Sequence, residues 1–284
     1  MNVYVNGSFT PIEEASVPVT DRGFLFGDGI YEVIRSVEGR FFRTEAHLKR
    51  MREGLRALSI PFGDEELAQL PDYGRKLLEM NGHSTGEATL YIQITRGAAW
   101  PRTHSYPDTE PTCFFYTNSF EPYRKLHREG IKAITLPDLR WSRCNLKTVN
   151  LLPNAMARQQ AVEAGTNSAV MIRDGQITES PNANIFAVMD GELYTYPLCS
   201  YILDGITRQL VLEIAEEFSI PLNTVPVQQE QLHQVEELFF SGTTTDIQPV
   251  VEIDGRPVGT GKPGPVTRKI QKAHRKALNQ QSGN

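Results

Sequence analysis

The sequence predicts a fold that mixes α-helices and β-strands, of the α/β or α+β class, in two domains. Three observations predict it. The chain of 284 residues is longer than one compact core of ordinary size. Segments that alternate like strands are interleaved with segments whose apolar residues recur at helical spacing. A turn-rich linker over 119–123 divides an N-terminal α/β domain, 1–118, from a C-terminal domain, 124–284.

The first domain is expected to begin with a β-hairpin, because Asn6-Gly7 suits a two-residue turn after an alternating segment. A glycine-rich corner then leads into a strand. The first helix is expected to be capped by Thr44 and to end before Pro61. The remaining elements expected here are a strand over 31–37, a second helix over 64–80, and strands over 88–95 and 113–117.

The second domain shows short strands separated by turns such as Arg173-Asp174-Gly175, a pattern typical of a barrel-like sheet. We expect three helices beside it, the last from the basic C-terminal stretch. The strands are expected near 132–135, 169–173, 185–189 and 193–196, and the helices near 154–164, 207–218 and 268–276.

Composition and charge exclude several classes of protein. A formal net charge of −5 gives no basic surface for nucleic acid or anionic lipid. The N-terminus lacks the basic and apolar regions of a secretion signal, so we expect a cytoplasmic protein. Three widely spaced cysteines, Cys113, Cys144 and Cys199, predict free thiols and no metal site.

The sequence neighbours of Lys147 favour a reactive, neutral amine. It lies among apolar and small polar residues, with Arg140 and Arg143 upstream. Desolvation and nearby cations both favour the neutral amine of a lysine, which is the form that attacks a carbonyl carbon. Lys147 is therefore a candidate for a Schiff base. The alternative is an ordinary exposed lysine, since charged side chains mostly face solvent.

Glu179 lies between a strand end and a run of small polar residues. A carboxylate beside the nitrogen of a pyridine-ring cofactor keeps that nitrogen protonated, so that the ring withdraws electrons from a substrate carbanion. Glu179 and Lys147 could act on two ends of one such ring. The alternative for Glu179 is a turn-initiating acid on a solvated loop.

Two segments could bind a phosphate group. Residues 203–208 lead into a helix at Thr207, whose first amides would face an anion. Residues 241–246 follow a buried-looking strand and offer a run of hydroxyl groups. Each segment alone is weak evidence, because hydroxyl-rich turns often only cap structure.

Taken together, these segments resemble the class IV (fold type IV) pyridoxal-phosphate-dependent aminotransferases. The resemblance covers nearly the whole chain and rests on six motifs in the family's order and spacing. They are Phe26–Glu32, His47–Arg50, Leu146–Asn150, Thr178-Glu179 with Asn184–Phe186, Gly205–Arg208 and Gly242–Thr244.

The resemblance implies an N-terminal α/β domain, a C-terminal pseudo-barrel domain that carries the cofactor lysine, and a homodimer. Pyridoxal 5'-phosphate is implied in the cleft between the domains. The family pattern gives Lys147 the Schiff base and the proton transfer, and gives Glu179 the pyridine nitrogen. The implied phosphate and ring contacts are Arg50, Ile206, Thr207, Thr243 and Thr244, with Leu203 behind the ring.

Within the family, Arg102 and His104 are similar to the residues with which D-amino-acid transaminases bind the substrate carboxylate, aided by Tyr31. In that subgroup the other subunit supplies them. The resemblance therefore implies ping-pong transamination of D-amino acids, such as D-alanine, with a 2-oxo acid. Gly242 and Pro181 depart from the usual pattern, and Trp100 could narrow the pocket or its entrance.

Other activities stay open at this point. They are branched-chain L-amino acid or (R)-amine transamination and aminodeoxychorismate cleavage, all within the same family. A non-catalytic protein that has kept the phosphate site is a more remote alternative.

Overall fold

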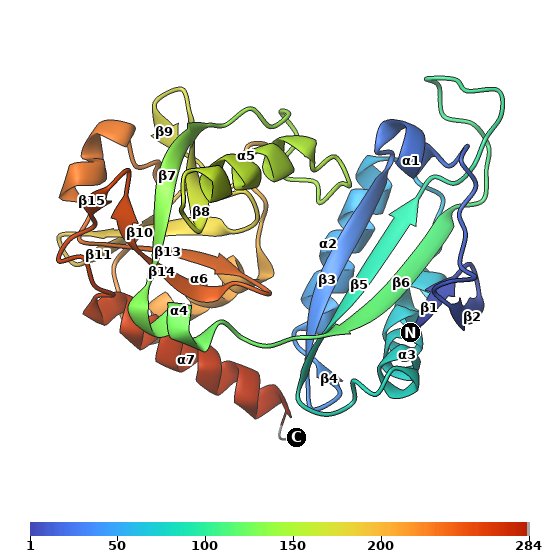
Figure 1. Cartoon of the computed structure of the whole chain (residues 1–284), viewed down its shortest axis with the longest axis horizontal. Helices are drawn as coiled ribbons and strands as arrows, with labels where there is room; N and C mark the ends of the chain where they lie inside the picture. The colour runs from blue at the N-terminus through green and yellow to red at the C-terminus, as the bar shows by residue number, and fades with distance from the viewer. Residues whose placement is uncertain (283–284) are drawn as a thin grey trace. The chain divides into compact units, whose positions relative to one another are not determined.

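The computed structural model describes residues 1–282, which form two compact units (Figure 1). The first is formed mainly by Met1–Glu121 and the second by Pro122–Asn145 and Leu151–Leu278. The segment Leu146–Asn150, which the sequence analysis assigned to the C-terminal domain, is part of the first unit. Its backbone pairs there with a strand, since the Tyr31 amide donates to the Lys147 carbonyl at 2.9 Å. The domain limits 1–118, 119–123 and 124–284 stay predictions.

The first unit is an antiparallel sheet of six strands in the order β2-β1-β6-β5-β3-β4, with two long helices and one short one. Its elements are β1 (Asn2–Val5), β2 (Ser8–Pro11), α1 (Arg22–Phe26), β3 (Gly29–Val37), β4 (Arg40–Phe41), α2 (Thr44–Ala57), α3 (Asp64–Met80), β5 (Glu87–Thr95) and β6 (Thr112–Ser119).

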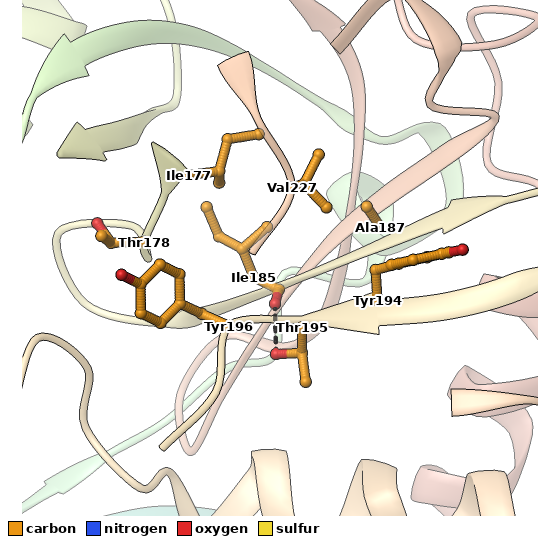
Figure 2. Close-up of a pocket in the computed structure, with 8 residues that line it drawn as sticks. All are labelled: Ile177, Thr178, Ile185, Ala187, Tyr194, Thr195, Tyr196 and Val227. Carbon is orange, nitrogen blue, oxygen red and sulfur yellow. Dashed lines mark hydrogen bonds between the residues drawn. The ribbon is translucent and has the colours of Figure 1, made fainter. Parts of the chain in front are cut away.

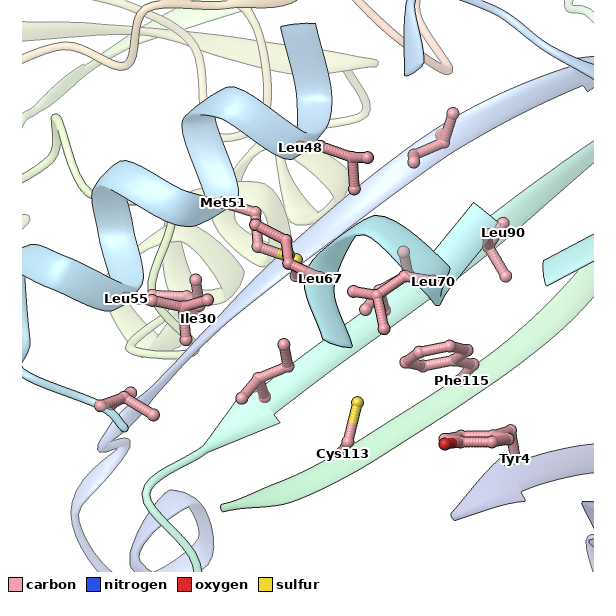
Figure 3. Packing of buried hydrophobic residues seen from close by; sticks show 14 of the residues in the cluster. Tyr4, Ile30, Leu48, Met51, Leu55, Leu67, Leu70, Leu90, Cys113 and Phe115 are labelled. Carbon is pink, nitrogen blue, oxygen red and sulfur yellow. The ribbon is translucent and has the colours of Figure 1, made fainter. Parts of the chain in front are cut away.

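The core of this unit lies between the sheet and helices α2 and α3 (Figure 3). Leu48, Met51 and Leu55 recur at helical spacing on α2, which places them on one face of the helix. They pack with alternate residues of β3, such as Ile30 and Ile34, because successive strand residues point to opposite faces. Packing therefore fixes α2 against the sheet.

The second unit is a sheet of nine strands in the order β12-β11-β10-β13-β14-β7-β8-β9, with β15 paired to β14. In Figure 1, β7 and β10 of this sheet run in clearly different directions, so the sheet curls in the way expected of a pseudo-barrel. Its elements are α4 (Arg124–Glu129), β7 (Ile131–Pro137), α5 (Leu152–Glu163), β8 (Ser168–Arg173), β9 (Gln176–Ile177), β10 (Asn184–Met189), β11 (Glu192–Thr195), α6 (Ile206–Glu217), β12 (Leu222–Asn223), the 3-10 helix η1 (Gln229–Gln234), β13 (Glu237–Gly242), β14 (Asp246–Ile253), β15 (Arg256–Pro257) and α7 (Pro265–Ser282).

The expected fold class is confirmed, and so are the N-terminal hairpin and the helix over 64–80. The cap predicted at Thr44 is wrong. Thr44 is the first helical residue, and Arg43 precedes it in the left-handed region, with φ 54°. The Thr44 hydroxyl donates instead to the Phe41 carbonyl at 3.4 Å. Within residues 1–282, no helix combines the length and the apolar composition that crossing a membrane would require.

Candidate functional site

Lys147 lies beside the start of β3 in the first unit. Thr148 forms a backbone bridge with Ile30, and the Lys147 carbonyl accepts from Tyr31. The Lys147 side chain is half-buried, and its Nζ lies 4.2 Å from the centroid of the Tyr31 ring. The next turn is fixed by Asn150, whose Nδ2 donates to the Gly27 carbonyl at 3.1 Å. The structure therefore brings Lys147 and Tyr31 together beside the start of β3.

Arg50 lies on α2 and is held by a buried carboxylate on β3. Its Nε and Nη2 donate to the two oxygens of Glu32 at 2.7 and 2.8 Å, and His47 Nδ1 lies 2.8 Å from the same carboxylate. Burial alone would raise the pKa of Glu32, but the Arg50 and His47 side chains hold it well below its usual range. Burial lowers the pKa of His47, against the opposing effect of the Glu32 charge.

This arrangement predicts how stability depends on pH. The pKa of Glu32 in the folded state lies below the unfolded value of 4.5, so its ionised form stabilises the fold above that value. The stabilisation is lost as the pH falls toward the folded-state pKa. In Glu32→Gln we therefore expect a shallower decline of the unfolding free energy below pH 4.5. At neutral pH we expect a loss of about 3 kcal/mol, because the Arg50 and His47 side chains lose their charged partner.

Urea unfolding from neutral pH to well below pH 4.5 measures both effects. Glu53→Gln, a change at an exposed position of the same helix, is the matched control and should keep the wild-type slope. A Glu32→Gln protein whose stability falls with acid as steeply as the wild type would contradict the prediction.

Glu179 is buried in the second unit and is surrounded by donors. Arg140 Nη1 forms an ion pair with its Oε1. The Asn184 amide Nδ2 and the Leu203 backbone N–H donate to its Oε2 at 2.9 and 3.2 Å. Asn184 Nδ2 also lies 2.8 Å from the Leu203 carbonyl, so it joins the strand β10 to the segment before α6. Glu179 is therefore held in one orientation.

A second carboxylate, Asp138, shares Arg140 with Glu179. Arg140 Nε and Nη2 donate to the two Asp138 oxygens at 2.8 and 2.7 Å, and the Thr178 hydroxyl donates to Asp138 at 2.9 Å. Burial would raise the pKa of Asp138, yet these donors lower it to about 2. For Glu179 burial dominates and raises the pKa, with Arg140 acting against it. One buried arginine thus stabilises two buried carboxylates.

The two segments suggested for phosphate lie close to this network. Helix α6 begins after Gly205, which provides no side-chain cap, so the first amides of Ile206 and Thr207 face outward from the helix start. A Cβ at Gly205 would lie 2.1 Å from Asn184 Oδ1, so a larger residue there would displace the Asn184 side chain. Asn184 in turn pairs with Ser241, two residues before Thr243 in the turn that carries Thr243 and Thr244. The buried Ser241 hydroxyl has no hydrogen-bond partner within the described chain.

Arg102 and His104 lie together in the loop after β5 of the first unit. The Arg102 guanidinium carbon is 4.2 Å from the centroid of the Phe26 ring, and the His104 ring is 5.6 Å from it, edge-on at 60°. Trp100, in the same loop, is 80% exposed. Both predicted carboxylate-binding residues therefore contact one aromatic ring.

The sequence analysis gave no role to Asp138, Asn184 or Phe26, and it named Arg140 only as a cation upstream of Lys147, whereas the structure pairs Arg140 with Asp138 and Glu179. The spacing of Asp138 and Arg140 could have indicated their ion pair, because residues two apart on an extended segment point the same way.

A small cavity in the second unit contains none of the predicted site residues (Figure 2). Its lining is Ile177, Thr178, Ile185, Ala187, Tyr194, Thr195, Tyr196 and Val227. Residues 1–282 contain no group of three or more His, Cys, Asp or Glu side chains suited to a metal ion.

Comparison with known proteins finds aminotransferases by sequence and by structure. A family model described as amino-transferase class IV matches residues 29–253. The D-alanine aminotransferase of Staphylococcus aureus (strain MSSA476) is 39% identical, with 99% of each chain covered. That of Bacillus licheniformis is 38% identical, with 96% of this chain and 95% of the relative covered.

Solved structures agree in fold. The branched-chain amino acid aminotransferase of Escherichia coli has a TM-score of 0.89 at 25% identity, covering 95% of this chain and 92% of that chain. Another branched-chain amino acid aminotransferase, solved with pyridoxamine 5'-phosphate, has a TM-score of 0.88 at 28% identity, covering 99% of this chain and 94% of that chain.

Proposed function

Since the chain belongs to the class IV amino-transferases, we propose that it is a pyridoxal 5'-phosphate-dependent transaminase of D-amino acids such as D-alanine. The amino group passes to a 2-oxo acid in a second half-reaction, by a ping-pong mechanism. The D-alanine aminotransferases that match the chain along 99% of its length support this substrate class. The pyridoxamine 5'-phosphate in the structural neighbour described above supports the cofactor.

The residues of each unit fit parts of this cofactor. Lys147, half-buried beside Tyr31, would hold the cofactor through its aldehyde, and the same amine would carry the substrate Cα proton. Glu179 would accept a hydrogen bond from the protonated pyridine nitrogen, and Leu203 would contact the ring. When bound, pyridoxal phosphate supplies an electron-withdrawing ring that stabilises the negative charge left on Cα. We assign the phosphate to Arg50, Ile206, Thr207, Thr243 and Thr244.

The uncapped start of α6 supports the phosphate assignment, because amides at a helix N-terminus bind anions. Arg50 adds a guanidinium group, and Glu32 fixes its orientation through two hydrogen bonds. The Ser241 hydroxyl, which has no partner among residues 1–282, belongs to the strand that leads into the turn assigned to the phosphate. These features fit a dianion better than they fit a turn that only caps structure.

The observation that carries the D-amino-acid proposal is that Arg102 and His104 both contact the ring of Phe26. A guanidinium and an imidazole that share one aromatic neighbour suit a substrate α-carboxylate, with the Tyr31 hydroxyl as a further donor. Where the carboxylate is held decides which enantiomer directs its Cα–H toward Lys147. We propose that these residues serve the partner subunit of a homodimer with shared active sites.

Branched-chain L-amino acid transamination is the second candidate, favoured by the names of the solved structural neighbours. Incubating the holoenzyme with D-alanine or L-leucine, each with 2-oxoglutarate, separates the two. We expect 2-oxo acid from D-alanine. Product from L-leucine alone would overturn the D-amino-acid proposal, and pyruvate released from aminodeoxychorismate without an acceptor would indicate a lyase.

Arg102→Met tests the carboxylate contact. A hydrogen bond to a charged group contributes about 1.5 to 3 kcal/mol, so kcat/KM for D-alanine should fall roughly tenfold to a hundredfold. Arg75→Met, at an exposed ion pair with Asp72, is the matched control and should leave kcat/KM unchanged. Wild-type kinetics in Arg102→Met would remove Arg102 from the substrate site.

A further inference from the structure

The motif Phe26-Gly27-Asp28 has no assigned contact with substrate or cofactor, yet it lies against the loop that carries Arg102 and His104. Phe26 is the last residue of α1. Its ring contacts the side chains of both loop residues, and the guanidinium carbon of Arg22 also lies 4.5 Å from its centroid. One phenyl ring therefore joins the first turn of this short helix to both carboxylate-binding candidates.

Arg22 holds the backbone of the same loop. It is buried, and its Nη1 donates to the Thr103 carbonyl at 2.7 Å, between the two residues that touch Phe26. Its Nε donates to Asp28 at 2.8 Å, and Arg96 pairs with the same carboxylate. Residues 102 to 104 are thus held by their side chains and by their backbone.

Asp28 also organises the start of the loop. Arg96, only 2% exposed, donates to both Asp28 oxygens at 2.8 and 3.1 Å, and its guanidinium carbon lies 3.6 Å from the centroid of the Tyr106 ring. The Arg96 carbonyl accepts from the Thr109 hydroxyl at 2.7 Å. Gly97 has φ +94°, and a Cβ there would lie 1.9 Å from a backbone oxygen of Glu110. The first residues of the loop, Arg96 and Gly97, therefore contact its last residues, Thr109 and Glu110.

We propose that Phe26 is a positioning residue for substrate specificity, which holds Arg102 and His104 in the arrangement that binds a substrate α-carboxylate. This proposal rests on the proposed function. Phe26 acts through the two loop residues, by a cation–π contact with one and an edge-on ring contact with the other. A side chain held in advance loses less conformational freedom when the carboxylate binds, so affinity rises without a new contact.

Phe26→Leu tests this role, because leucine fills similar space without an aromatic face. We expect KM for D-alanine and for the 2-oxo acid to rise about three- to thirtyfold, with a much smaller change in kcat. Propionate, a carboxylate that has no amine to react, should bind to the holoenzyme more weakly by the same factor in calorimetry. Phe26→Tyr keeps the ring and should restore both values.

The matched control is Phe218→Leu, which removes a ring lying 4.5 Å from the Lys269 ammonium in the second unit. It should leave KM and propionate binding unchanged. Thermal unfolding of each variant checks that the fold is intact, and Phe26→Met replaces Phe26→Leu if the latter is unstable. Loss of stability with unchanged propionate affinity would show a purely structural ring and would overturn the proposal.

A double-mutant cycle with Arg102→Met separates this proposal from the proposed function. If Phe26 acts through Arg102, adding Phe26→Leu to Arg102→Met should weaken propionate binding little further. Full additivity of the two effects would overturn the positioning role. If Arg102→Met itself leaves propionate binding unchanged, the carboxylate site of the proposed function fails, whatever Phe26 does.

Discussion

Replacing Lys147 by alanine is expected to abolish transamination and the visible absorption of the lysine-bound cofactor together. Alanine has no amine to bond to the cofactor aldehyde, and none to move the proton from Cα. A positioned acid–base group alone typically contributes roughly 10²- to 10⁴-fold to rate, so nearly all turnover should be lost. Absorbance spectra and single-turnover rates with D-alanine measure the two effects.

The matched control is Lys125→Ala, because that lysine is 75% exposed and only forms a long ion pair with Glu129. It should keep both spectrum and rate. Borohydride reduction of the wild-type holoenzyme, followed by peptide mapping, should place the reduced adduct on Lys147. An adduct on another lysine, or wild-type absorbance in Lys147→Ala, would rule out this assignment.

Much of the fold was predictable because its signals are local. The apolar spacing of α2 and α3 and the Asn6-Gly7 turn are each read from a few neighbouring residues. The error at Thr44 shows the limit of such reading. A threonine before a helical pattern suggests a cap, but here the chain enters α2 through Arg43 with a positive φ. The short helix α1 was missed because five residues are too few for a periodic pattern.

The candidate site was only partly predictable, because its supporting contacts join residues distant in sequence. Lys147 and Glu179 stand in recognisable motifs, but the Arg140 pairing with Glu179 spans 39 positions. The contact of Arg22 with the Thr103 carbonyl spans 81 positions. Such pairs follow from the folded sheet and from no local pattern. The roles of the site residues, the homodimer and the cytoplasmic location stay predictions.

Glu179→Gln is expected to lower the rate of the half-reaction with D-alanine by about 10²- to 10³-fold, the usual cost of removing one pre-organised electrostatic group. Glutamine fills the same space but carries no charge, so it no longer favours a protonated pyridine nitrogen. Removal of the Cα proton should then become slower. The deuterium isotope effect with Cα-deuterated D-alanine should rise, because proton removal limits the rate more fully.

The decisive control is Asp138→Asn, since Asp138 and Glu179 both pair with Arg140 in the same buried network. If Glu179 served only to neutralise Arg140, either change would reduce activity in proportion to the stability lost. Because we assign the pyridine nitrogen to Glu179 alone, Glu179→Gln should lose far more activity than Asp138→Asn at equal loss of unfolding free energy. Equal losses of activity, with no change in the isotope effect, would make Glu179 a structural partner of Arg140 and leave the cofactor nitrogen without its acid.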